Sequence, residues 1–240
     1  MVGLSINAKD KLENGQMHVL MKGDEDQKKF DFSVCLAPIF GSSPKWLLLV
    51  EFIEFYRLQG AENFLIYVQE ISNVTEKVLE NYVSSGILRT IKMGNSTKCL
   101  KKHRCRHELQ LQDCIMRTRG ASKWVATVDL DERIMEIDQN RKIVDFLRDQ
   151  ENPKIGENRF RCSWILRYED IPESLEKVEE MENFLPMLAW HNTSHVAPQN
   201  HTTKSVVRPE TVESMGVHGV QKFKKGFDVN LVDPGIALVR

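Results

Sequence analysis

The 240-residue chain is long enough for one large domain or two small ones, and its 41% hydrophobic and 28% charged residues are ordinary for a globular protein. Its formal net charge of −1 excludes a general attraction to nucleic acid or to anionic membranes, so an anionic ligand would need a local site. No apolar run approaches the roughly 20 residues that a membrane span requires, and residues 1–30 carry no signal-peptide core.

The first predicted elements are a strand and a helix. The apolar run over 31–41 ("DFSVCLAPIFG") is broken by a proline and ends in a glycine, which predicts a strand followed by a turn. Ser43 and Pro44 then favour the start of a helix over 45–60, as its N-cap and its first-turn proline.

The alternation of strands and helices continues to the end of the chain. A strand is predicted over 63–68, and Asn73 with Glu76 resembles a capping box at the start of a second helix. Further strands are predicted over 87–93, 123–130, 159–168, 203–207 and 235–239, and further helices over 106–119 and 139–149, the latter capped by Asp138. This order predicts an α/β fold with a mostly parallel sheet, helices on both faces and an irregular segment over 170–203.

Two features bear on the cellular compartment. Four Asn-x-Ser/Thr sequons, at Asn73, Asn95, Asn192 and Asn200, exceed chance and favour a secretory-pathway protein. The five cysteines allow two disulfides and one free thiol, with a connectivity that the sequence does not determine. A zinc site is the alternative for Cys99, His103, Cys105 and His107, although their spacing matches no common zinc motif.

Acidic residues follow the predicted strand over 123–130. In the stretch "VATVDLDERIME" (125–136), Asp129 and Asp131 lie on the same side of an extended chain, because successive side chains alternate. Ligands of parallel sheets bind beyond the carboxyl ends of the strands. Two carboxylates at this position suit a divalent cation that also binds substrate phosphates. The alternative is that the two acids form a turn or cap a helix. The similar pattern at 24–26 lies in a polar segment and is interpreted as solvated charge.

The chain resembles glycosyltransferase family 92, whose members have the GT-A fold. The resemblance rests on the segments "KWLLLVEFIEFYRLQG", "DCIMRTRGASKWVATVDLDERI", "WHNTSHVAPQNHTTKSVVRPETVESMGVHGV" and "GIALVR" and runs from about residue 31 to the end. It implies a GT-A-type, Rossmann-like catalytic domain over 31–240 that is truncated at its C-terminus, preceded by a polar leader or stem remnant over 1–30.

The resemblance also implies an activity and a place in the cell. Such an enzyme moves a sugar, galactose in the best-known members, from a UDP donor to a glycan acceptor with inversion and with a divalent metal, Mn²⁺. It works in the Golgi lumen and is held in the membrane by an anchor that this chain lacks. No nucleic-acid partner is expected.

The resemblance assigns metal and donor roles to three residues. Asp129 would bind the donor nucleotide or the metal, and Asp131 would bind the metal directly. His218 lies where enzymes with the GT-A fold often place a third ligand, and a neutral imidazole is an acceptable ligand beside carboxylates. Its alternative role is packing in a glycine-flanked turn.

Further donor contacts are expected from four residues. Lys204 and Arg208 could offset the charge of a diphosphate, with solvated surface charge as the alternative. Pro38, after the first strand, and Glu70, after the second, occupy the positions where a uridine would lie in this architecture.

Inversion requires one carboxylate as a general base on the acceptor hydroxyl. Glu169 and Asp170, after the predicted strand over 159–168, are the candidates, and turn-forming acids before a proline are the alternative. Glu132 is the reserve candidate.

Two other classes of protein compete with a glycosyltransferase. One is a catalytically silent glycosyltransferase-like domain that binds glycans or partner proteins, which loss of Asp129 or Asp131 would favour, and both are present. The other is a cytosolic nucleotidyltransferase, against which the sequons and the absence of a glycine-rich phosphate loop count.

Overall fold

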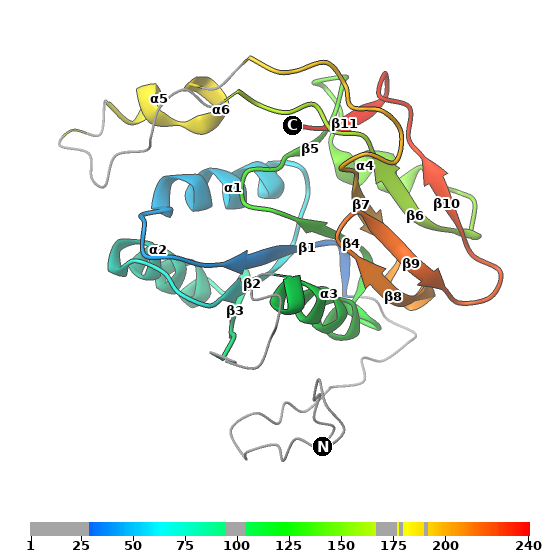
Figure 1. Cartoon of the computed structure of the whole chain (residues 1–240), viewed down its shortest axis with the longest axis horizontal. Helices are drawn as coiled ribbons and strands as arrows, with labels where there is room; N and C mark the ends of the chain where they lie inside the picture. Colours follow the sequence, from blue (N-terminus) through cyan, green and yellow to red (C-terminus); the bar gives the residue numbers. More distant parts are fainter. Residues whose placement is uncertain (1–28, 95–103, 167–176, 178–179, 190–191) are drawn as a thin grey trace, which may run out of the picture.

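The computed structural model describes residues 29–94, 104–166, 177, 180–189 and 192–240. A seven-stranded sheet runs through the molecule (Figure 1). Its strands in spatial order are β10 (Asp228–Leu231), β6 (Ile155–Phe160), β7 (Lys204–Val207), β4 (Ser122–Val128), β1 (Phe30–Ile39), β2 (Asn63–Val68) and β3 (Leu88–Lys92). β7 is antiparallel to both of its neighbours, and the other neighbouring pairs are parallel. The predicted α/β class with a mostly parallel sheet is therefore confirmed.

Helices cover both faces of the sheet. α1 (Trp46–Leu58), α2 (Asn73–Ser84) and α4 (Ile143–Arg148) contribute side chains to the core on one face, and α3 (Arg104–Thr118) packs on the other. Three short helices complete the structure. α5 (Met181–Phe184) and α6 (Pro186–Ala189) follow one another, with α6 in contact with α1, and η3 (Pro209–Thr211) joins β7 to β8 (Val212–Gly216) and contacts β4 and α3. None of the described helices is long and apolar enough to cross a membrane.

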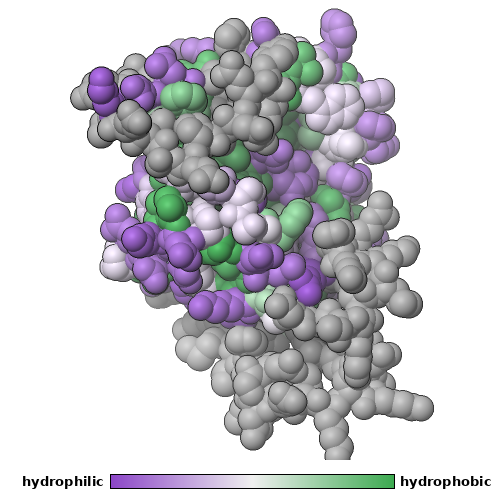
Figure 2. All heavy atoms as spheres, turned by 60° about the vertical axis from the view of Figure 1, so that its left-hand side comes forward, coloured by the Kyte–Doolittle hydropathy of each residue, from purple (hydrophilic) through white to green (hydrophobic). Residues whose placement is uncertain are grey.

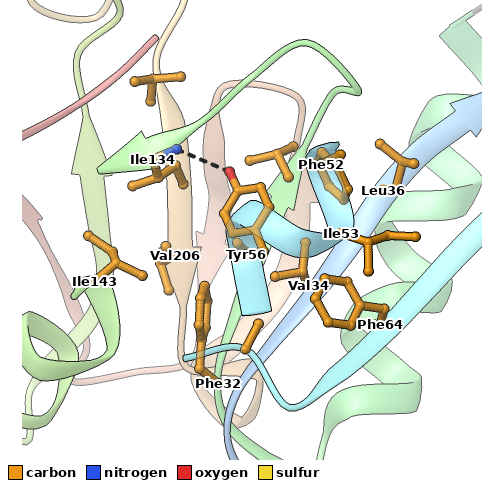
Figure 3. Close-up of a cluster of buried hydrophobic side chains, with 14 of the residues drawn as sticks. Phe32, Val34, Leu36, Phe52, Ile53, Tyr56, Phe64, Ile134, Ile143 and Val206 are labelled. Carbon is orange, nitrogen blue, oxygen red and sulfur yellow. Dashed lines mark hydrogen bonds between the residues drawn. The ribbon is translucent and has the colours of Figure 1, made fainter. Parts of the chain in front are cut away.

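Alternation along β1 divides its side chains between the two cores. Val34 and Leu36 lie on one face with Phe52 and Ile53 of α1, as Figure 3 shows. Cys35 lies between them in sequence and points to the opposite face, because successive side chains of a strand point to opposite sides. Both faces of β1 are buried, as expected for a strand in the middle of a covered parallel sheet.

A disulfide joins the sheet to the helix on its second face. It links Cys35 of β1 to Cys114 of α3, both fully buried. Cys162 is a buried free thiol. The zinc alternative involves Cys99 and His103, which lie outside the described residues.

The predicted caps of three helices are wrong. α1 begins after Lys45, not Ser43, and the Lys45 backbone N–H donates to Thr75 Oγ1 of α2. α2 is capped by Ser72, whose side chain accepts from the Thr75 backbone N–H. α4 begins only at Ile143, and Asp138 instead accepts from the backbone N–H of Asn140 in a local turn.

The end of α1 agrees with the prediction. Gly60 has φ +90°, and a Cβ added there would come within 2.3 Å of Val144 Cγ1 in α4. Glycine is required at this position both by the left-handed backbone and by the close approach of α4.

The second half of the chain differs most from the prediction. β6 ends at Phe160 instead of continuing to 168, and its buried polar residues Glu157 and Asn158 break the apolar alternation. Two antiparallel ribbons add to the sheet: β8 (Val212–Gly216) with β9 (Gly219–Phe223), and β5 (Ile134–Glu136) with β11 (Ala237–Val239). Of these four strands and β10, only β11 was predicted, because each of the others contains at least one polar residue whereas β11 is apolar throughout.

On the side that Figure 2 shows, the described residues form no single large hydrophobic area. Hydrophobic residues there form small groups between hydrophilic ones. Two exposed hydrophobic residues, Phe40 and Trp164, line a pocket.

Candidate active site

One edge of the sheet carries a pocket of about 610 Å³, a size typical of small-molecule sites. β1, β4 and β6 run in the same direction and end at this edge, whereas the antiparallel β7 begins there. The pocket is lined by residues from each of these strand ends, among them Ile39, Asp129, Cys162 and Lys204. The topology thus brings together residues that are more than 100 positions apart in the sequence.

Three charged side chains meet on one wall of the pocket. Lys204 Nζ lies 2.6 Å from Asp129 Oδ2 and 3.0 Å from Glu132 Oε2. The Lys204 side chain is only 3% exposed, whereas that of Asp129 is 37% exposed. The lysine is therefore held beneath the carboxylates, and Asp129 is open to the pocket.

Burial and neighbouring charges act in opposite directions on the pKa values of Glu132 and Lys204. Burial raises the pKa of Glu132 to about 7, although the Lys204 ammonium acts in the opposite direction. Burial by itself would lower the pKa of Lys204, but Glu132 and Asp129 outweigh it and the net shift is upward. The charged form of Lys204 is therefore the stable one in this site.

The loop that carries the acids is fixed from below by Tyr56 of α1. Its hydroxyl accepts from the Ile134 backbone N–H at 3.1 Å (Figure 3) and donates to the Glu132 carbonyl at 3.2 Å. The Asp129 backbone N–H in turn donates to Glu132 Oε2 at 2.8 Å. The loop is thus tied to the core by a side chain that is itself fully buried.

Arg133 fixes the same loop through its guanidinium group. It is 2% exposed and donates to the carbonyls of Leu130 and Glu132. It also pairs with Glu51 of α1 at 3.3 Å. Glu51 lines the pocket and accepts from the Met187 backbone N–H at 2.6 Å, so it joins α1 to α6 at the pocket wall.

Asp131 and His218 reach the pocket from two different segments. Both are exposed and line it, Asp131 from the loop after β4 and His218 from the turn between β8 and β9. Asp131 forms no hydrogen bond or ion pair with the residues that the structure describes. His218 Nδ1 lies 3.2 Å from the Thr203 carbonyl oxygen, which places the ring beside the start of β7.

Carboxylate and imidazole groups are suitable ligands for a divalent cation, but these residues do not form a complete metal site by themselves. No three Asp, Glu, His or Cys side chains of the described residues form a ready-made metal site. A cation that binds substrate phosphates needs only one or two protein carboxylates, because phosphates and water complete its shell. Asp131 and the pocket-facing side of Asp129 meet that requirement.

Pro38 lies at the pocket, but Glu70 does not line it. Pro38 is near the end of β1, where the register with β2 shifts, which accommodates a residue that has no backbone N–H. Glu70 is exposed, and its backbone N–H donates to the Ile39 carbonyl at 3.3 Å. Burial lowers the pKa of Lys45, a residue that lines the pocket on this side, and the charge of Glu70 acts against that shift.

Arg208 lies away from the pocket, contrary to the expectation from the sequence. It is four residues beyond Lys204 along β7, about 13 Å in an extended chain. Its guanidinium stacks on Trp124 at 4.2 Å and donates to the Ile155 and Gln150 carbonyls. It lines a second, smaller pocket at the opposite edge of the sheet and does not line the pocket that contains Asp129.

Glu169 and Asp170, the predicted general bases, lie outside the described residues. The sequence analysis also missed pocket residues that the structure brings in: Lys45, Glu51, Arg133 and Trp164. A signal was present for Glu51, because it is a single acid within the apolar run "LLLVEFI" of α1.

Comparisons with known proteins agree with the geometry. The sequence pattern of glycosyltransferase family 92 matches residues 30–240. The chain is 26% identical over 200 residues to beta-1,4-galactosyltransferase galt-1 of Caenorhabditis elegans, covering 80% of this chain and 43% of that protein. It is 24% identical over 210 residues to a glycosyltransferase family 92 protein of Oryza sativa subsp. japonica, covering 86% of this chain and 32% of that protein. The chain thus spans less than half the length of these curated relatives.

Among solved structures, the chain is similar to the mannosyltransferase PcManGT from Pyrobaculum calidifontis in complex with GDP-Man and Mn²⁺. The match has a TM-score of 0.49 at 10% identity and covers 90% of this chain and 58% of that one. HddC from Yersinia pseudotuberculosis matches with a TM-score of 0.43 at 8% identity over 88% of this chain and 92% of that one.

Proposed function

The chain belongs to glycosyltransferase family 92, and from this membership we propose that it transfers a sugar, galactose, from a UDP donor to a glycan acceptor. The observation that carries the proposal is the pocket at the sheet edge, where Asp129 and Asp131 face the cavity above the buried Lys204. A diphosphate would be repelled by these acids without a cation, and Asp131 forms no hydrogen bond or ion pair with the described residues, although its charge interacts with that of the buried Arg133.

The donor would lie on the β1 side of the acids. Pro38 and Phe40 line the pocket there, and the Lys45 ammonium offers a positive charge for the diphosphate. Asp129, Asp131 and His218 would hold a divalent cation, Mn²⁺, which when bound would offset the charge of the leaving UDP. Lys204 holds the Asp129 carboxylate in place and offsets the charge of two acids, a role closer to positioning than to direct phosphate binding.

Inversion requires a carboxylate that accepts the proton of the acceptor hydroxyl as the oxygen attacks the anomeric carbon. Glu169 and Asp170 stay the candidates from the sequence. Among the described residues Glu132 is the candidate, because it lines the pocket and burial raises the pKa of its carboxyl, which makes it a better proton acceptor.

The protein would act in the Golgi lumen. The sequons and the buried disulfide between Cys35 and Cys114 support an oxidising, glycosylating compartment. Expression through a secretory host should give protein that loses mass on treatment with an N-glycosidase. Protein of unchanged mass would contradict a luminal location.

The test of the activity is a screen of UDP-sugars for release of UDP, with Mn²⁺ and with a chelator. We expect metal-dependent hydrolysis of UDP-galactose above that of UDP-glucose and UDP-N-acetylglucosamine. Metal-dependent binding of UDP without any hydrolysis would favour the catalytically silent alternative. Absence of both would overturn the proposal.

A further inference from the structure

We propose that Trp164 is the stacking platform for a pyranose ring of the acceptor glycan. The inference rests on the proposed function and adds to it the place and the chemistry of the acceptor subsite. It is carried by the exposure of the indole, its rigid attachment and its position across the acids from the donor side.

Trp164 is unusually exposed for its size. Its side chain is 47% exposed, and it lines the same pocket as Asp129 and Asp131. Two of the exposed large hydrophobic side chains among the described residues are aromatic, Trp164 and Phe40, and both line this pocket. Among the residues that the structure describes, the exposed large aromatic side chains are therefore gathered at the pocket.

The backbone of Trp164 is fixed on both sides. Its N–H donates to Ser194 Oγ at 3.0 Å, and its carbonyl accepts from the Ser194 N–H at 2.9 Å. The preceding Ser163 N–H donates to the Val239 carbonyl of β11 at 2.8 Å. A platform held in this way loses little conformational freedom when a ligand binds.

The indole ring also has a side-chain support. The ring of His201 lies perpendicular to it, with centroids 5.7 Å apart and an interplanar angle of 83°. His201 thus limits the rotation of the indole, while nearly half of the Trp164 side chain stays open to solvent.

Indole and pyranose are complementary in their chemistry. One face of a pyranose carries mainly C–H groups, whose small positive charge is attracted to the negative face of an aromatic ring. The polar edge of the sugar stays in water or meets hydrogen-bonding groups such as the Ser163 hydroxyl, which also lines the pocket. A half-exposed tryptophan beside polar groups can therefore contact the C–H face of a sugar while the polar edge of the sugar forms hydrogen bonds.

Strand order distinguishes the acceptor from the donor nucleotide. The expected uridine position is at the end of β1, whereas Trp164 follows β6, with β4 and β7 between them. Three strand spacings separate β1 from β6, about 14 Å. Asp129 and Lys204 lie at the ends of the two strands in between, so a sugar on Trp164 would meet the donor at the acids from the other side.

The test uses Trp164→Ala and Trp164→Phe, with Ile236→Ala as the control, because Ile236 is 50% exposed and does not line the pocket. Binding of methyl β-galactoside, methyl β-N-acetylglucosaminide and methyl α-mannoside is measured by saturation-transfer NMR. Binding of UDP with Mn²⁺ is measured by calorimetry on the same proteins.

We expect at least one glycoside to bind the wild type. Trp164→Ala should weaken that binding roughly tenfold or more, Trp164→Phe should retain part of it, and Ile236→Ala should not change it. UDP binding should be the same in all four proteins.

Three results would overturn the inference. The first is a wild type that binds UDP but none of the glycosides, and the second is unchanged glycoside binding by Trp164→Ala. The third is loss of UDP binding in Trp164→Ala, which would place the uracil on the indole. A wild type that binds a glycoside through Trp164 but binds no UDP would instead contradict the proposed function and leave the platform standing.

Discussion

The Lys204 ammonium lies 2.6 Å from the Asp129 carboxylate, although the two residues are 75 positions apart in the sequence. It occupies the side of Asp129 that faces the protein, and it also contacts Glu132. The positive charge of Lys204 therefore reduces the repulsion between the acids that lie together at the end of β4. One charge of the cluster is neutralised from within, and Asp131 remains available to a ligand.

Asp131→Asn should leave the fold intact and weaken the Mn²⁺-dependent binding of UDP at least tenfold, about 1.4 kcal/mol. The substitution keeps the volume of the side chain and removes the charge of an exposed residue that forms no hydrogen bond or ion pair with the described residues. Calorimetry with and without Mn²⁺ measures the effect. Asp24→Asn, in the other Asp-x-Asp of the sequence, is the control and should bind as the wild type does. Equal, metal-independent binding by wild type and Asp131→Asn would mean that these acids are not a donor site.

Lys204→Met should lower the free energy of unfolding substantially, because it leaves Asp129 and Glu132 together without their cation. Removing one partner of a fully buried ion pair costs about 3–5 kcal/mol, and the partial exposure of Asp129 should make the cost smaller. Urea unfolding measures it. Lys222→Met is the control, since the Lys222–Glu213 pair lies at the surface and should contribute little. Similar losses in both variants would show that the buried cluster has no special role.

Tyr56→Phe should lower the free energy of unfolding by about 1–3 kcal/mol, the cost of leaving the buried Ile134 N–H without its acceptor. Chemical denaturation of the purified variant measures the change. Tyr82→Phe removes a hydroxyl that donates to Glu54 at a half-exposed position, so its effect should be clearly smaller. An unchanged stability of Tyr56→Phe would indicate that the acid loop is held by its other contacts alone.

Asp31→Asn should destabilise the protein at neutral pH by up to about 1 kcal/mol and have no effect in strong acid. Hydrogen bonds from Lys123 and Arg148 hold the pKa of Asp31 below its usual range. A carboxyl whose pKa is lower in the folded state contributes stability above its unfolded pKa, about 3.9, and loses it as the pH falls through the folded pKa. Urea unfolding of wild type and variant at several pH values checks the sign. A difference that stays constant down to strong acid would contradict it.

Reduction of the Cys35–Cys114 disulfide should lower the free energy of unfolding by about 2–5 kcal/mol, because it releases a loop of many residues in the unfolded chain. Denaturation with and without a reductant measures this. The double variant Cys35→Ala/Cys114→Ala is the control: its stability should be reduced already and should respond far less to the reductant. An equal response in the double variant would assign the effect to other cysteines.

Local patterns in the sequence were sufficient for the class of fold and for the acids. The strand β2 was predicted with the bounds that the structure has, since apolar β-branched and aromatic residues are continuous there and both faces are buried. Asp129 and Asp131 were located at the end of a central strand for the same reason. These inferences need only the period of a strand and the rule that parallel strands end at one edge of the sheet.

Contacts between distant residues decided the rest of the site. Lys204 and Arg208 are four residues apart in the same segment and were expected to act together. Because β7 runs antiparallel to β4, its first residue meets Asp129 and the residue after its end lies at the opposite edge, over Trp124. A sequence pattern carries the spacing along a strand but not the direction in which that strand enters the sheet. That direction is set by packing of the whole domain, and it determined which lysine or arginine reached the acids.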